Sequence, residues 1–323
     1  MALAGLTRPA RFALALLGLA FLPACLETAP TLKPVARPAG LKGPATAPLA
    51  SQTPSAKRLE LTDYYARIQE KLLAQGLMRT DGGGPDTRFG PATLIENFRT
   101  VAFTEEYRLG GLSGAGTGSG MLHRWTKPVR YAVRFGASVS ADQRSSDSGD
   151  ITRFAARLAR LSGHPISAAP AASANFHVLV MSTDDEAELM ALIPRISPRN
   201  ARSVKSLFRN LSRATHCLVL IQPAAEPEGA LESAIVLIRA EHPRLGRQSC
   251  IHEEMTQGLG LMKDSRYARP SIFNDDEEFA FLTTHDEMLL KMLYDRRLRP
   301  GMSFPEARPI AAQIARELTG TNF

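Results

Sequence analysis

The segment Cys250-Ile-His-Glu-Glu-Met-Thr-Gln-Gly-Leu-Gly-Leu261 is the most informative stretch of this 323-residue chain. Two acidic residues precede a glutamine and a Gly-Leu-Gly-Leu run, and two segments with the pattern of β-strands come before them. Glycine commonly ends helices, so the pattern predicts a helix near residues 251–259. The segment therefore indicates a helix that follows a sheet and stops at a glycine turn.

A structural interpretation accounts for part of this segment. In a helix that begins at Ile251, Glu253 and Glu254 lie in the first turn, where acids favour the helix dipole by ~0.3–1 kcal/mol. Ser249 would then be the N-cap. This interpretation leaves Gln257 unexplained, because a glutamine on the core side of a helix needs a partner, for which Glu254 is a candidate.

A chemical interpretation rests on a second segment, Leu282-Thr-Thr-His-Asp-Glu-Met-Leu-Leu-Lys-Met-Leu-Tyr294. Together the two segments resemble the metzincin-type zincin metallopeptidases. Those enzymes carry His-Glu-x-x-His-x-x-Gly-x-x-His on one helix, and a later helix often closes on Leu-Tyr. Histidines at i and i+4 share one zinc ion, and the glutamate polarises the metal-bound water. The resemblance implies a zincin-like α+β fold.

The ligands of that motif are replaced in this chain. When the Gly-Leu-Gly-Leu run is aligned with the glycine of the metzincin motif, Glu253 falls at the first zinc ligand and Glu254 at the catalytic acid. Gln257 then falls at the second zinc ligand and Lys263 at the third. The alternative starts the motif at His252 and Glu253, and a threonine then stands at the second ligand. Glutamine is a poor zinc ligand and a protonated lysine cannot bind a metal. We therefore expect no cofactor; the alternative is zinc or another divalent metal with Glu254 as general base.

A narrower resemblance covers residues 95–302. Besides the 250–261 segment, it rests on Asp264-Ser265, Ser271-Ile-Phe-Asn-Asp275 and Leu293-Tyr-Asp295. These motifs are similar to the domain-of-unknown-function 2927 family of bacterial lipoproteins. The resemblance implies a fold and a location in the cell envelope, but no reaction.

The rest of the body alternates between strand and helix patterns. Residues 94–103 are apolar and fit either a helix or a strand. The single tryptophan, Trp125, is expected to pack at a strand start. Strands are predicted over 129–135, 176–181, 216–221 and 234–239, and helices over 61–75, 150–161, 184–193, 204–211, 277–294 and 305–318. Histidines 123, 164, 177, 216, 242 and 285 show no paired ligand spacing, which favours structural roles. We predict one α+β domain over 59–323, with a mixed sheet.

The N-terminus resembles a bacterial lipoprotein signal. Arg8 and Arg11 precede an apolar run over 12–22, too short for the ~20 residues that span a bilayer. The run ends in Leu22-Pro-Ala-Cys25, which resembles the lipobox. The resemblance implies that residues 1–24 are removed and that Cys25 is acylated. Leu26 replaces the aspartate that retains lipoproteins in the inner membrane, so we expect the periplasmic face of the outer membrane.

We interpret residues 25–58 as a tether. Prolines recur through this stretch without an apolar period, so it cannot build a core. The chain carries a net charge of +7. Residues 26–58 hold five basic residues and one acidic residue, a net of +4, and 59–323 a net of only +1. The tether is either simply solvated or lies near anionic lipid headgroups, and the nearly neutral body argues against nucleic acid as a partner.

Two cysteines remain after the lipidated one. An exported chain with two cysteines favours a disulfide between Cys217 and Cys250; the alternative is two buried thiols.

We therefore expect a lipid-anchored envelope protein, most simply a catalytically inactive module that binds an envelope protein or a peptidoglycan peptide. The alternatives are a metal-dependent peptidase or hydrolase and a purely structural lipoprotein.

Overall fold

The centre of the sheet is formed by strands with apolar side chains on both faces. The computed structural model describes residues 53–103 and 120–320. All six residues of β4 (Phe176–Met181) are buried, and β6 (Ala230–Arg239) lies parallel beside it. Val178 and Val180 belong to one core cluster, while Leu179 and Met181 belong to another. The period of two sends alternate side chains to opposite faces, which explains the continuous apolar run of β4.

The sheet has six strands and is mainly parallel. The order is β1-β6-β4-β2-β3, and β5 pairs with β6. The four remaining strands are β1 (Arg124–Trp125), β2 (Val129–Phe135), β3 (Ile166–Ala168) and β5 (Cys217–Pro223). β5 is antiparallel to β6, whereas the other pairs are parallel. The predicted α+β class with a mixed sheet is confirmed.

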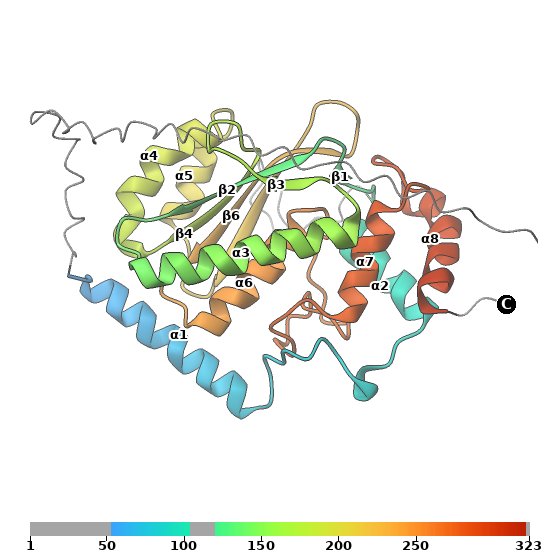
Figure 1. Ribbon diagram of the computed structural model, residues 1–323, viewed down its shortest axis with the longest axis horizontal. Coiled ribbons are helices and arrows are strands. Elements are labelled where there is room, and N and C mark those ends of the chain that lie inside the picture. Colours follow the sequence, from blue (N-terminus) through green and yellow to red (C-terminus); the bar gives the residue numbers. More distant parts are fainter. Residues whose placement is uncertain (1–52, 104–119, 321–323) are drawn as a thin grey trace, which may run out of the picture. The chain divides into compact units, whose positions relative to one another are not determined.

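Helices cover both faces of the sheet (Figure 1). On one face lie α3 (Ala141–Ser162) and α6 (Arg244–Gln257), and on the other α4 (Glu186–Ile196) and α5 (Ala201–Arg209). Three helices pack together beyond the end of α6: α2 (Pro91–Phe103), α7 (Thr284–Tyr294) and α8 (Phe304–Thr319). Helix α1 (Ala56–Ala74) lies along the outer side of α6. Among these described helices, none combines the length and hydropathy needed to cross a membrane.

Some helix boundaries differ from the sequence predictions. Residues 94–103 are helical, as part of α2. The helix predicted from residue 277 begins at Thr284, because residues 277–283 form a loop that ends in the Thr283 cap. Helix α6 begins at Arg244, seven residues before Ile251, after the N-cap Pro243. The last difference changes the interpretation of the acidic pair, as described below.

A buried carboxylate holds the loop between α6 and α7. Asp286 is fully buried and accepts hydrogen bonds from the backbone N–H groups of Ile272 and Thr283, both at 2.9 Å. It also accepts the hydroxyls of Ser271 at 2.6 Å and Thr283 at 2.8 Å. Beside it, His285 Nε2 lies 3.1 Å from the Asn97 amide on α2. One side chain thus joins the long loop to the start of α7.

We expect Asp286→Ala to lower the free energy of unfolding by about 3 kcal/mol or more, because several buried donors lose their acceptor at once. Urea unfolding followed by circular dichroism measures this change. Asp275→Ala is the matched control: this exposed aspartate lies in the same loop and should change stability by less than about 0.5 kcal/mol. Equal effects of the two substitutions would contradict the role given to Asp286.

Candidate functional site

The acidic pair lies in the second half of α6. The helix spans Arg244–Gln257, so Glu253 and Glu254 stand next to its C-terminal end. The prediction that they occupy the first turn is wrong, and Ser249 is an interior residue and not the N-cap. Acids near a helix C-terminus meet the unfavourable end of the dipole. The dipole therefore does not account for them.

A disulfide joins α6 to the antiparallel strand of the sheet. Cys217 begins β5 and Cys250 lies on α6; their Cα atoms are 5.8 Å apart, and the bond spans 33 residues of sequence. Cys250 is 3% exposed. The bridge predicted from the sequence is present in the structure, although Cys250 lies within the helix and not before it.

Three potential metal-binding groups meet beside this disulfide. A sulfur of Cys217 and carboxylate oxygens of Glu253 and Glu254 lie within 4.8 Å of one another. Within residues 53–103 and 120–320 no other group of three histidine, cysteine or acidic side chains is as close. The sulfur is bonded to Cys250, and a disulfide sulfur is not the thiolate that binds zinc. Two carboxylates from adjacent residues remain, which is fewer than a zinc site uses.

The other positions of the zincin motif do not complete a set of zinc ligands. Gln257 is 6% exposed, and its Nε2 donates to Asp264 Oδ1 at 2.7 Å. Asp264 thus holds the amide nitrogen of Gln257, for which Glu254 was the candidate partner. Lys263 follows the glycine turn, and its backbone N–H bonds the carbonyl of Val101 at 3.2 Å. Since an ammonium cannot bind a metal, the residues present do not fit zinc in this placement of the motif.

The alternative placement of the motif also fails in the structure. The His252 ring stacks on Phe154 of α3, with ring centroids 4.0 Å apart, and lies 4.6 Å from Phe281. Its Nδ1 accepts the backbone N–H of Leu282 at 3.1 Å. Burial, with a smaller effect of Arg157, lowers the pKa of His252 to about 3. His252 is thus a neutral, stacked side chain on the α3 side of the helix.

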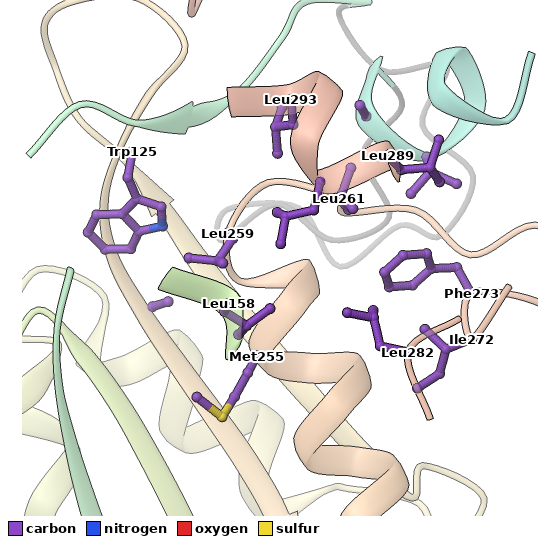
Figure 2. Close-up of a cluster of buried hydrophobic side chains, with 14 of the residues drawn as sticks. Trp125, Leu158, Met255, Leu259, Leu261, Ile272, Phe273, Leu282, Leu289 and Leu293 are labelled. Carbon is purple, nitrogen blue, oxygen red and sulfur yellow. The ribbon is translucent and has the colours of Figure 1, made fainter. Parts of the chain in front are cut away.

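The glycine turn after α6 is held from two directions. Trp125 Nε1 donates to the carbonyl of Gly258 at 2.8 Å, and the Tyr294 hydroxyl donates to the carbonyl of Leu259 at 2.9 Å. Gly260 has φ +121°, and a Cβ there would lie 2.3 Å from the carbonyl oxygen of His123. Figure 2 shows the apolar cluster around this turn, with Trp125 on one side of Leu259 and Leu293 on the other. The turn therefore serves packing. Trp125 packs in the core as predicted, although it ends the short strand β1 and does not begin a strand.

A ring cluster beneath α1 was not predicted from the sequence. Tyr65 of α1 is 1% exposed, and its ring centroid lies 3.9 Å from that of His242 and 5.5 Å from that of His216. Its hydroxyl donates to the carbonyl of Arg213 at 2.9 Å. The histidines are 26 residues apart, so a search for ligand spacing missed them. His216 comes just before β5 and His242 just after β6, so the antiparallel pairing of these strands brings them to the same open end of the hairpin, which was the usable signal.

The pocket at this cluster is small and covered by α1. It has a volume of about 40 Å³ and is bordered by Glu253 and both cysteines. Gln69 of α1 accepts the backbone N–H of Gly246, on α6, at 3.0 Å. Such a volume holds water but not a peptide. Glu254 does not border this pocket, so the peptide-binding cleft expected next to Glu254 stays a prediction.

The pKa of His252 predicts acid-sensitive stability. An unfolded histidine titrates near pH ~6.5, so between pH 6.5 and 3 the unfolded chain binds a proton that folded His252 does not. Stability is then lost as the pH falls through this range. We expect the His252→Phe variant to lose about 1–2 kcal/mol less than the wild type between pH 7 and pH 5. Urea unfolding at both pH values measures this; identical losses would contradict the assignment.

Comparison with known proteins adds one finding. The chain matches the family described as "Protein of unknown function (DUF2927)" over residues 91–313. No curated protein and no solved structure matches it. The matched region contains every strand and the helices α2 to α7, with the disulfide and the acidic pair, whereas α1 lies before it. The chain belongs to the family of proteins of unknown function DUF2927.

Proposed function

We propose that this chain is a lipid-anchored protein of the bacterial cell envelope that acts as a binding or structural module and not as a metal-dependent enzyme. The Cys217–Cys250 disulfide is the observation that carries this proposal. Disulfides persist mainly in oxidising compartments such as the periplasm, which supports export. The same bond removes the only sulfur of the three-group cluster from metal binding.

The anchor in this proposal is Cys25. The signal, Cys25 and the tether to residue 52 lie outside the described residues, so their support is the sequence pattern alone. Leu26 favours the periplasmic face of the outer membrane. The proposed partner is an envelope protein or a peptidoglycan peptide, because these are what an anchored periplasmic domain meets.

The edge of β5 that faces away from β6 supplies the proposed binding surface, next to the side of α6 that carries Glu253. The disulfide fixes this side next to β5, and among the described strands only β6 pairs with β5. A free strand edge is a site where an extended peptide adds by backbone hydrogen bonds. A peptide that reached Glu253 from the other side would first have to displace α1.

A second candidate function is a metal-dependent peptidase or hydrolase with Glu254 as general base. One observation favours it: Glu254 is 4% exposed and lies with Glu253 and Cys217 in the densest cluster of potential ligands in the described chain. The disulfide argues against it, because two carboxylates alone make a weak site.

Metabolic labelling with an alkyne fatty acid tests the anchor. We expect the wild-type protein to incorporate the label and to fractionate with outer membranes, and Cys25→Ser to lose both properties. Thr28→Ala, three residues along the tether, is the control and should retain them. Labelling that persists in Cys25→Ser would overturn lipidation at this residue.

Metal content separates the two candidate functions. The Cys25→Ser protein would be purified without reductant, incubated with zinc, manganese and calcium, desalted, and analysed by mass spectrometry. We expect well below one tightly held metal ion per chain, since fewer than three ligands remain. One ion per chain that is lost in Glu254→Gln and kept in the control Glu306→Gln would establish the metalloenzyme and reject our proposal.

A further inference from the structure

A larger pocket lies across α6 from the disulfide. Successive residues of a helix are about 100° apart, so His252 and Gln248 point away from the side that carries Cys250 and Glu254. The pocket has a volume of about 330 Å³, within the range of small-molecule sites. Its walls come from α3 (Asp150, Arg153, Phe154, Arg157), from α6 (Arg244, Gln248, Ile251, His252) and from Phe281.

The polar wall of this pocket is rich in cationic donors. Arg153, Arg157 and Arg244 line it, and Asp150 is the only acid among the lining residues. The Asp150 side chain is 9% exposed and pairs with Arg153, with Arg244 at 3.4 Å, and with the Gln248 amide at 3.0 Å. One carboxylate thus orients two guanidinium groups without neutralising both of them.

The two guanidinium groups remain accessible. The side chains of Arg153 and Arg244 are 71% and 59% exposed. A guanidinium has five N–H donors, and each of these side chains uses only part of them on Asp150. Arg157 is more constrained, because it bonds Glu287 at 2.7 Å and the carbonyl of Leu282 at 3.2 Å. The open donors therefore belong chiefly to Arg153 and Arg244.

Another part of the pocket wall is aromatic. Phe154, His252 and Phe281 form a stack in which the imidazole is the middle ring. Nδ1 of His252 accepts a backbone N–H, so the proton of the neutral ring is on Nε2. Within the described part of the chain, that N–H makes no hydrogen bond, and the residue borders the pocket. Phe154 is 3% exposed and the imidazole lies between the two phenyl rings, so the stack meets the pocket through the half-buried Phe281 and the edge of His252.

We propose that this pocket binds a small organic anion, whose carboxylate or phosphate group is held by Arg153 and Arg244 and whose planar body packs against Phe281, the half-buried end of the ring stack. Guanidinium groups bind both kinds of oxyanion in bidentate geometry. The site is separate from the acidic side of α6 and does not depend on the function proposed above. Because both arginines are exposed, binding weakens as the salt concentration rises.

Calorimetric titration of the Cys25→Ser protein tests this site with four probes. We expect phenyl phosphate and benzoate to bind, inorganic phosphate to bind at least tenfold more weakly than phenyl phosphate, and benzylamine not to bind. The first two probes show whether phosphate or carboxylate is preferred. Binding of benzylamine equal to that of benzoate, or of inorganic phosphate equal to that of phenyl phosphate, would overturn the proposed ligand class.

Variants locate the binding. The double variant Arg153→Gln and Arg244→Gln should weaken phenyl phosphate binding at least tenfold, and both side chains are exposed enough to be replaced without unfolding the protein. Arg316→Gln, on the exposed face of α8, is the matched control and should bind like the wild type. Circular dichroism confirms that each variant is folded. Unchanged affinity in the folded double variant, or an equal loss in Arg316→Gln, would refute this site.

Discussion

Helix α6 is fixed on several sides, and the geometry around it follows from this constraint. The Cys217–Cys250 bond joins it to β5. On the α3 side, Arg247 donates to Asp147 at 2.8 Å, and their side chains are only 9% and 1% exposed. A buried ion pair of this kind tolerates little displacement, because separating the charges leaves each one desolvated. The acidic pair and the arginine-lined pocket therefore keep their separate places on one rigid helix.

The parts of the fold that sequence predicted best are those set by local patterns. Val129–Phe135 and Phe176–Met181 were predicted with the boundaries that the structure shows, because period-two patterns and buried apolar runs arise from neighbouring residues. The start of α6 was missed because its first turns carry arginine, glycine and glutamine with little apolar periodicity. Tertiary contacts support those turns, including the hydrogen bond from Gly246 to Gln69.

The candidate site was predictable in its residues but not in their partners. The sequence singled out Glu253, Glu254 and Gln257, and it paired Cys217 with Cys250. It offered Glu254 as a candidate partner for Gln257, whereas Asp264, beyond the glycine turn, accepts the amide N–H. The helix ends at that turn, so helical spacing does not predict which residue beyond it lies close to Gln257. The stack of His252 on Phe154 likewise depends on how α3 crosses α6, which no local pattern encodes.

Helix α1 has a mechanical consequence for an anchored protein. Of its 19 residues only Leu61 and Tyr65 are buried, and it precedes the part of the chain that matches the family. With Cys25 acylated as proposed, tension between the membrane and the body would load this helix before the sheet. Because only two of its side chains are buried, α1 would detach before the disulfide-linked core is disturbed. Detachment of α1 would uncover the side chains of His216, His242 and Glu253. Which of these polar side chains face solvent would then depend on the tension between the domain and its membrane.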